Sequence, residues 1–488
     1  MLCQKSLRRR NARKLLESLE PRTLLSVTTT SYNIGAFDSY QLTDLDGQSG
    51  QEIVAVSGNQ ITVINPRLAT TTVFTPDAFT TLDFANLEGI AGQNIYTVAD
   101  TKVTVINPNN GSSHTYDLGA FTDLQLADLD GQAGLELVAF NGNVITVLNA
   151  HDGTVDTFTL PSGEIGIADL TNGLGNELYS LHGSTLTTLN VSTGTTTNFA
   201  IGAWDTFQTA DVDGIAGDEF ITSRGTNFTV HNLRTAINKT FNAGPWTSVT
   251  FADLDGIAGK EFFTTRSGAV TVINPKAGTT KTYSIGLYDT IDTADLDATA
   301  GQEIFTTRSG VIRVITPKTS NVRAYSVGLF DTLQTKNVDG VAGLEIITTR
   351  SGRATVVNNR LHTIKSMTIG SFNTLQFAQV GVLAGQQILA ARSGAITIAN
   401  PNTAAVRSIS IGAWNSLAIG NVLPAAGQEV ITTFGNTLTV RNPATGAPAP
   451  TTLVIGPFTS LVVADLDGLA GDEILYTAGP ALNILKFS

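Results

Sequence analysis

Carboxylates at a fixed spacing are the residues of this chain whose types could do chemistry together. In the stretch DLDGIAGKE, residues 253–261, aspartates stand at the first and third positions and a glutamate at the ninth. Alternate residues of a tight loop can turn their oxygens toward one point, and Ca²⁺ prefers six to eight oxygen ligands. A site for a hard cation is therefore one interpretation of the stretch. Six copies keep all three carboxylates, and the candidate ligands are Asp44, Asp46, Glu52, Asp128, Asp130, Glu136, Asp211, Asp213, Glu219, Asp253, Asp255, Glu261, Asp295, Asp297, Glu303, Asp465, Asp467 and Glu473.

The same carboxylates have an interpretation that needs no ion. An aspartate at the start of a turn accepts hydrogen bonds from the amides of its own loop, and Asp-Gly forms a tight bend. In this interpretation the carboxylates cap the turn and bind nothing.

The motif is repeated along the chain, whereas a catalytic constellation normally occurs once. Successive copies are 42 residues apart, except for one interval of 41 and one of 44. The copies begin at Asp44, Asn86, Asp128, Asp169, Asp211, Asp253, Asp295, Asn337, Gln379, Asn421 and Asp465. Eleven copies of a unit of about 40 residues predict a propeller, an array or a solenoid.

Each repeat contains four short segments that favour β-strands. The expected strands of the copy at Asp295 are residues 291–296, 303–308, 311–316 and 322–327, each rich in β-branched residues. Ser309 and Gly310 are suited to a two-residue hairpin turn with glycine at positive φ. Four antiparallel strands in about 40–45 residues form a propeller blade. The sequence therefore predicts an all-β protein, a β-propeller of eleven four-stranded repeats.

The ends of the chain predict how this ring closes. Residues 27–35 resemble a fourth strand, and residues 481–488 resemble a third strand. The first strand can therefore complete the last blade, which removes a free sheet edge. Eleven blades exceed the usual four to eight. We expect a single large ring, with two fused smaller propellers as the alternative.

The motif also resembles the calcium loop of FG-GAP and VCBS-type repeats, the blades of integrin-alpha-like propellers. The resemblance covers all eleven repeats and implies calcium as the bound ion. The chain departs from that family at the fifth position of the loop, where the family has Asp or Asn. The residues found there are Gln48, Gln132, Ile215, Ile257, Thr299 and Leu469, so the expected affinity is lower.

The N-terminal segment, residues 1–26, differs from the rest of the chain. Leu19, Glu20, Pro21, Arg22, Leu24 and Leu25 resemble the LEPR-x-LL segment of large bacterial extracellular proteins. The resemblance implies export to the cell surface or the medium of a bacterium, although the segment lacks the apolar region of an ordinary secretory signal. We expect a disordered targeting segment over residues 1–26 and the propeller over residues 27–488.

Charge and composition exclude several classes of partner. Without the N-terminal segment, 22 basic and 39 acidic residues remain, a net charge of about −17. Such a body disfavours nucleic acid and favours cations or basic surfaces. The one cysteine, Cys3, lies in the N-terminal segment, so the body can form no disulfide. The sequence contains no run of about 18 apolar residues, so no membrane-spanning helix is expected.

Two further residue types recur with the repeat. An aromatic residue lies seven residues before ten of the eleven motif starts, and Ser162 is the exception. Packing between blades or a stacking surface for sugars would explain these aromatics.

Five arginines also share one position, and either pairing with Asp205, Asp289 and Asp331 of neighbouring blades or an anion-binding arc would explain them. They are Arg224, Arg266, Arg308, Arg350 and Arg392, expected on the ring face opposite the acidic loops.

No catalytic signature stands out from the repeats. The five histidines fall at unrelated positions in their repeats, and no nucleophile elbow or phosphate-binding loop is present. We therefore expect a non-enzymatic binding or adhesion protein that presents one ring face to a protein or a glycan, without any cofactor other than calcium. A carbohydrate-active enzyme and a structural component of the cell envelope are the alternatives. The oligomeric state stays open.

Overall fold

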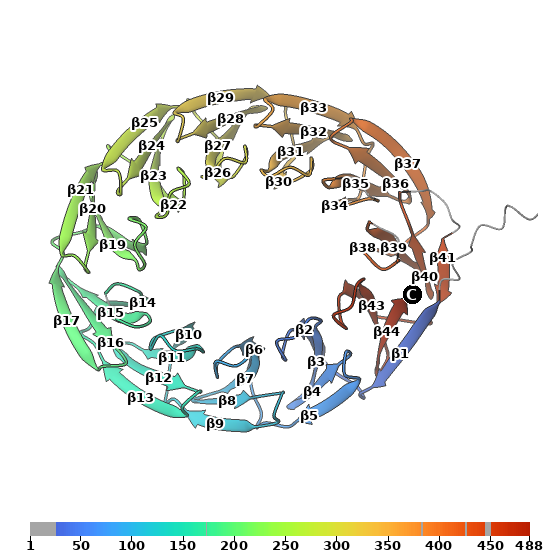
Figure 1. Ribbon diagram of the computed structural model, residues 1–488, viewed down its shortest axis with the longest axis horizontal. Coiled ribbons are helices and arrows are strands. Elements are labelled where there is room, and N and C mark those ends of the chain that lie inside the picture. Colours follow the sequence, from blue (N-terminus) through green and yellow to red (C-terminus); the bar gives the residue numbers. More distant parts are fainter. Residues whose placement is uncertain (1–25, 172, 382–383, 425–426, 445–449) are drawn as a thin grey trace, which may run out of the picture.

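The computed structural model describes residues 26–171, 173–381, 384–424, 427–444 and 450–488. Their 44 strands form eleven four-stranded antiparallel sheets arranged as blades around one ring (Figure 1). The predicted all-β propeller of eleven blades is confirmed, and the alternative of two fused rings is wrong. The N-terminal segment, predicted over residues 1–26, lies outside the described residues except for Ser26.

Blades are numbered here in chain order. The strands of blades 1–5 are β2 (Ser39–Thr43), β3 (Glu52–Ser57), β4 (Gln60–Asn65), β5 (Thr70–Phe74); β6 (Thr81–Ala85), β7 (Asn94–Ala99), β8 (Lys102–Ile106), β9 (Ser113–Asp117); β10 (Asp123–Ala127), β11 (Glu136–Asn141), β12 (Val144–Asn149), β13 (Thr154–Thr159); β14 (Glu164–Ala168), β15 (Glu177–His182), β16 (Thr185–Asn190), β17 (Thr195–Ala200); and β18 (Thr206–Ala210), β19 (Glu219–Arg224), β20 (Asn227–Asn232), β21 (Ile237–Asn242). Blades 6–10 contain β22 (Ser248–Ala252), β23 (Glu261–Arg266), β24 (Ala269–Asn274), β25 (Thr279–Ser284); β26 (Thr290–Ala294), β27 (Glu303–Arg308), β28 (Val311–Thr316), β29 (Asn321–Ser326); β30 (Thr332–Lys336), β31 (Glu345–Arg350), β32 (Arg353–Asn358), β33 (Thr363–Thr368); β34 (Thr374–Ala378), β35 (Gln387–Arg392), β36 (Gly394–Asn400), β37 (Ala405–Gly412); and β38 (Ser416–Gly420), β39 (Glu429–Phe434), β40 (Thr437–Arg441), β41 (Thr451–Val454). Blade 11 combines β42 (Ser460–Ala464), β43 (Glu473–Ala478) and β44 (Ala481–Phe487) with β1 (Val27–Asn33).

The predicted turn between the second and third strands is present in blade 7. Ser309 and Gly310 both have positive φ, 47° and 77°, and Arg308 pairs with Val311 across them. Positive φ at both central residues is the geometry of a type I′ turn, whose twist matches that of the strands. The hairpin therefore fixes which residue ends the second strand, and in this blade that residue is an arginine.

The chain closes its ring as predicted. β1 lies antiparallel to β44 over seven residue pairs, from Val27 opposite Phe487 to Asn33 opposite Ala481. Figure 1 shows the first and last strands side by side at the outer edge of blade 11. The N-terminal strand thus covers the sheet edge that β44 would otherwise expose.

The hydrophobic core is divided among the spaces between successive blades. Each buried cluster joins residues of two neighbours; for example, Phe228 of blade 5 packs against Phe262 of blade 6. Trp246, one of the repeated aromatics, is half-buried against this cluster. Packing between blades, one of the two interpretations of the aromatics, is therefore confirmed.

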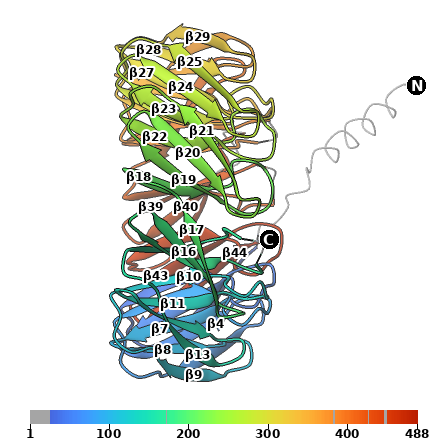
Figure 2. The same ribbon diagram turned by 90° about the vertical axis from the view of Figure 1, so that its left-hand side faces the viewer.

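The ring has two faces that follow from strand direction. The loop face carries the acidic loops, between the first and second strands, and the turns between the third and fourth. The hairpin face carries the hairpins between the second and third strands and the connections into the next blade. Figure 2 shows the ring from the side, with both faces at its edges. In the described part of the chain, no helix is long and apolar enough to cross a membrane.

Candidate functional site

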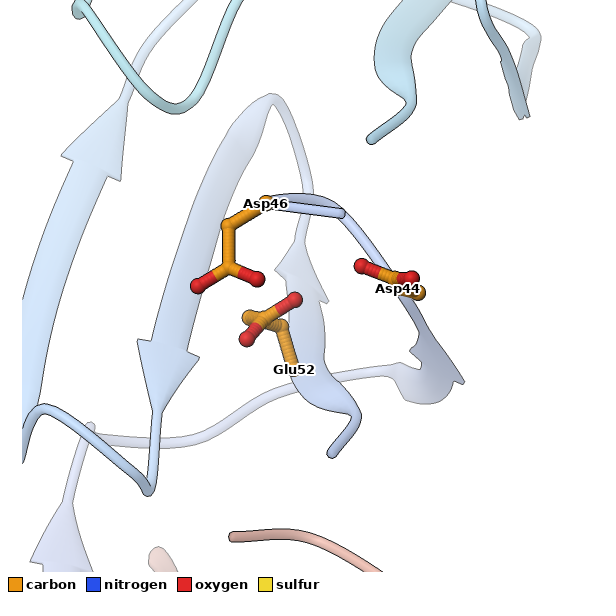
Figure 3. A group of neighbouring side chains, drawn as sticks. All are labelled: Asp44, Asp46 and Glu52. Carbon is orange, nitrogen blue, oxygen red and sulfur yellow. The ribbon is translucent and has the colours of Figure 1, made fainter. Parts of the chain in front are cut away.

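The three predicted carboxylates of a complete motif come together on the loop face. In blade 1, Asp44 follows β2, Asp46 lies in the loop, and Glu52 begins β3 (Figure 3). Figure 3 shows the carboxylates of Asp46 and Glu52 turned toward each other, with Asp44 across the loop. One carboxylate oxygen from each of the three lies within 4.8 Å of the others, and the same holds at Asp128, Asp211, Asp253 and Asp295 with their partners. Such clusters could hold a metal ion.

Each carboxylate of the motif also accepts a backbone amide of its own loop. In blade 6, Asp253 Oδ1 accepts the amide of Gly256 at 2.6 Å, and Asp255 Oδ1 accepts that of Ile257 at 2.8 Å. Glu261 Oε2 accepts the amide of Leu254 at 2.8 Å. The sixth complete motif, at Asp465, has the same three hydrogen bonds. The hydrogen bonds that turn capping requires are therefore present in these loops.

Incomplete motifs make the same hydrogen bonds with a side-chain amide in place of a carboxylate. Asn86 and Asn337 replace the first aspartate, and each accepts the fourth residue's amide at 2.8 Å. Asn94 and Gln387 replace the closing glutamate and still accept the second residue's amide, at 3.0 and 2.5 Å. Because side-chain amides suffice, the loop geometry depends on an acceptor oxygen and not on a negative charge.

The loops also join each blade to the next. The amide of Gln302, in the blade 7 loop, donates to the carbonyl of Asp253 in blade 6 at 2.7 Å. Equivalent bonds are present at ten of the eleven blade junctions, including the closure, where Gln51 donates to Asp465 at 3.1 Å. The second glycine of the loop fits against the preceding loop: a Cβ on Gly301 would lie 2.8 Å from the amide nitrogen of Gly256. The repeated motif is thus a junction between blades.

A partner of the acidic loops that the sequence reasoning missed lies at the end of the third strand. Asn274 Nδ2 donates to Asp255 Oδ2 at 2.9 Å, and Asn149 and Asn232 bond Asp130 and Asp213 in the same way. The signal in the sequence is an asparagine 19 residues after the third-position aspartate. In blade 7 that position is Thr316.

Basic side chains distinguish two of the six complete motifs. Arg67 Nη2 lies 2.5 Å from Asp46 Oδ2, and Lys486 contacts both Asp467 and Glu473. A positive charge therefore already faces the clusters of blades 1 and 11. At Asp128, Asp211, Asp253 and Asp295, no ion pair forms within the described residues, so the donor set of blades 3, 5, 6 and 7 fits a cation better.

The closing glutamates are buried beside the aspartates, and this raises their pKa. Burial of the Glu261 carboxyl, reinforced by the charges of Asp255 and Asp253, raises its pKa to about 7. Glu136, Glu219 and Glu303 reach about 7 for the same reasons, and burial also raises the pKa of Glu429 to about 7. These carboxyls are therefore poised to hold a proton near neutral pH.

The five arginines lie at the other end of the second strands, on the hairpin face. Each is the last residue of its strand: Arg224 (β19), Arg266 (β23), Arg308 (β27), Arg350 (β31) and Arg392 (β35). Four are exposed and Arg308 is half-buried. The expectation that acids and arginines occupy opposite faces is therefore confirmed.

The predicted pairing of these arginines with aspartates of neighbouring blades is wrong. Among the described residues one pair lies within 4 Å, Arg350 with Asp331, and the two belong to the same blade with 3.8 Å between Nε and Oδ1. Asp205 instead accepts the amide of Gly225 at 2.8 Å. Asp38, at the same position in blade 1, likewise accepts the amide of Gly58 at 2.8 Å.

The copies that depart most from the motif take individual roles. Asp169 forms an ion pair with Arg234 of the next blade, at 2.5 Å. Gln379 and Asn421 line two hollows on the loop face, of about 590 and 560 Å³.

Comparisons with known proteins assign no family to this chain. No protein-family model matches it, and no curated protein matches it. Among solved structures it is similar to a dihydro-heme d1 dehydrogenase, NirN, with 13% identity and a TM-score of 0.34 over 69% of this chain and 75% of that one. It is also similar to BBS1N in a complex with ARL6DN, with 12% identity and a TM-score of 0.26 over 57% and 90%. A third is an Agrocybe aegerita lectin that recognises non-reducing terminal N-acetylglucosamine, with 12% identity and a TM-score of 0.35 over 61% and 94%. At these TM-scores the likenesses give no indication of what this chain binds.

Proposed function

We propose that this chain is an exported binding propeller of a bacterial surface, which presents its hairpin face to an extracellular partner and catalyses no reaction. The observation that carries the proposal is the contrast between the faces. Loop-face carboxylates are used within the fold, whereas the hairpin face exposes a repeated set of arginines of which four have no carboxylate partner among the described residues. Charged groups left without partners on a rigid scaffold are suited to binding.

The partner classes that fit this face are glycans and proteins. Half-buried aromatics stand beside the arginines along the same face, which gives it flat apolar surface as well as positive charge. Export is supported by the LEPR-x-LL resemblance at Leu19 to Leu25, outside the described residues.

The test combines binding with turnover. The full chain is immobilised and exposed to a panel of extracellular polysaccharides and envelope proteins, and the release of reducing ends is measured in parallel. Saturable binding without turnover supports the proposal. Turnover would identify a carbohydrate-active enzyme instead, and the absence of any binding would favour a structural envelope component.

We also propose that calcium, where it binds, stabilises the loops of blades 3, 5, 6 and 7. The aspartate pair and the closing glutamate of each loop would hold the ion, which would neutralise three crowded carboxylates and act on structure only. Thermal unfolding in millimolar calcium and in chelator tests this, because a ligand of the folded state raises stability by RT ln(1 + [L]/Kd). A calcium-dependent shift that Asp253→Asn reduces would support the proposal, and an identical midpoint in both buffers would restrict these loops to turn capping.

A further inference from the structure

We propose that the arginines of blades 5–9 bind the carboxylates of a linear acidic polysaccharide, laid along the hairpin face. This deepens the proposed function and rests on it. The arginines form what is called here the arginine sector: Arg224, Arg266, Arg308, Arg350 and Arg392.

The arginine sector is regular, and its arginines form few contacts within the fold: Arg350 lies near Asp331, and Arg392 Nη1 donates to Ser371 Oγ at 2.8 Å. One arginine per blade occupies the same register position, the end of the second strand, in five successive blades. Apart from the 3.8 Å contact of Arg350 with Asp331, no carboxylate of the described residues lies within 4 Å of them. A guanidinium presents its donors as a planar fork that matches a carboxylate with two hydrogen bonds. The sector thus offers repeated carboxylate sites at the spacing of the blades.

Aromatic side chains alternate with these arginines. Trp246 Nε1 donates to the carbonyl of Gly225, next to Arg224, at 2.9 Å, and Trp414 Nε1 donates to the carbonyl of Arg392 at 3.4 Å. The aromatic of each following blade therefore lies beside the arginine hairpin of the blade before it, and Tyr288, Phe330 and Phe372 occupy the same position between them. All five aromatic residues are half-buried, so part of each residue is accessible at the surface. Ring faces of this kind accept the C–H faces of sugars while the arginines take the acid groups.

A hollow opens within the sector in blade 7. It has a volume of about 350 Å³, and its lining residues are Leu287, Arg308, Ser309, Val311 and Arg313. Two guanidinium groups beside apolar side chains suit a sugar ring that carries a carboxylate.

Blades 1–3 and the start of blade 4 have the opposite charge on the hairpin face. On the hairpin face of blades 5–9, the basic residues are the arginine sector and Arg353, and the acidic residues are Asp205, Asp289 and Asp331. On the hairpin face between residues 38 and 164, the one basic residue is Lys102 and the exposed carboxylates are six: Asp38, Asp77, Asp100, Asp117, Asp123 and Glu164. Like-charge repulsion would keep an acidic chain away from these blades. The binding track is therefore confined to one part of the ring.

A second copy of this chain fits the arginine sector less well. The carboxylates of blades 1–4 stand at several different positions of the repeat, in a hairpin, at strand ends and in connections between blades. They do not repeat from blade to blade, so they cannot match an arc with one arginine per blade. A linear polymer with an acid group in each repeating unit has the regularity that the sector has.

The test uses the full chain and polygalacturonate, with neutral dextran of similar length for comparison. The three tryptophans of the chain are Trp204, Trp246 and Trp414, and the last two contact hairpins of the arginine sector. We expect polygalacturonate to change the tryptophan fluorescence saturably, with an affinity that falls as salt rises, and dextran to give no change.

The decisive variant is Arg266→Gln/Arg308→Gln, matched by Lys276→Gln/Lys318→Gln in the same two blades. Lys276 and Lys318 are exposed on the loop face, where they donate to the carbonyls of Ala258 and Ala300. Both variants remove two positive charges, so only the face differs. We expect the arginine variant to raise the apparent Kd for polygalacturonate at least about tenfold, and the lysine variant to change it less than about threefold.

Four results would overturn the proposal. Equal losses in the two variants would show that only net charge matters, and equally tight binding of single-stranded DNA would show that any polyanion is accepted. Self-association that the arginine variant abolishes, without polysaccharide binding, would identify a second copy as the occupant. Binding of neutral glycans or proteins that the arginine variant leaves unchanged would overturn this inference and leave the proposed function standing.

Discussion

Blades 6 and 7 carry repeated charged residues on both faces of the ring, and the contacts of these residues differ between the two faces. On the loop face, Asp253 and Asp295 each accept an amide of their own turn, at 2.6 and 2.8 Å. On the hairpin face, Arg266 and Arg308 have no carboxylate within 4 Å among the described residues. Both features repeat, but only the first is explained by the fold. A repeated charge is therefore a candidate for binding when its own repeat provides no partner for it.

The largest effect is expected from the glycines that let successive loops interlock. A Cβ on Gly256, whose φ is 75°, would lie 2.3 Å from the backbone carbonyl carbon of Ala300 in the next blade. Gly286, on the hairpin face, has φ of 70° and open space around it. Both Gly→Ala changes lose about 1–2 kcal/mol to left-handed backbone strain, and Gly256→Ala should lose about 1–3 kcal/mol more through the clash.

Chemical denaturation of the two glycine variants measures this difference. Equal losses for Gly256→Ala and Gly286→Ala would mean that the contact between loops contributes no stability, against the junction role of the motif.

A smaller effect separates capping from charge at the first position of the loop. Asp253→Ala removes the acceptor of the Gly256 amide and should lower the free energy of unfolding by about 1–2 kcal/mol. Asp253→Asn keeps an acceptor oxygen, as Asn86 and Asn337 do in their blades. In chelator, its loss in the free energy of unfolding should therefore be only a few tenths of the loss for Asp253→Ala. If Asn were as damaging as Ala in chelator, the negative charge itself would be required.

The closing glutamates predict a dependence of stability on pH. Their carboxyls have a pKa of about 7 in the folded chain and about 4.5 as the ordinary value, so the folded state holds more protons between these two pH values. Stability is then full below about pH 4.5 and falls as the pH rises to about 7. In chelator, the midpoint of thermal unfolding should therefore be higher at pH 5 than at pH 8.

Exchange of the closing residue isolates this effect. Glu261→Gln removes one titrating carboxyl and should reduce the fall in midpoint between pH 5 and pH 8. Gln387→Glu adds a carboxyl at the position where blade 9 has an amide, and it should enlarge this fall. An unchanged profile in both variants would show that these glutamates do not titrate between the two pH values.

The fold followed from the sequence because each step of it is local. The 42-residue period, the Ser309-Gly310 hairpin and the strand-like ends at Val27 and Ala481 each depend on a few neighbouring residues. The contacts across blades did not follow, because they join segments one repeat apart. The bond from Gln302 to Asp253 and the fit of Gly301 against Gly256 are visible only when two loops stand side by side.

The site was predicted in part for a related reason. Spacing indicated that Asp253, Asp255 and Glu261 converge, and they do. It did not show that each oxygen would meet an amide first, or that Asn274 would reach Asp255 from the third strand. Nor could it show that four of the five arginines lack a carboxylate partner among the described residues, since this depends on how the side chain of a nearby residue such as Asp205 is held.

The central claim is that the charged side chains of the loop face act as hydrogen-bond acceptors that hold the loops of the ring, while the charged side chains of the hairpin face contribute little to the fold. The most direct measurement compares the free energy of unfolding of Asp253→Ala/Asp295→Ala with that of Arg266→Ala/Arg308→Ala, two charges in the same two blades on opposite faces. We predict a loss of about 2–4 kcal/mol for the aspartate pair and of less than about 1 kcal/mol for the arginine pair. Equal losses, or a larger loss for the arginines, would contradict the account.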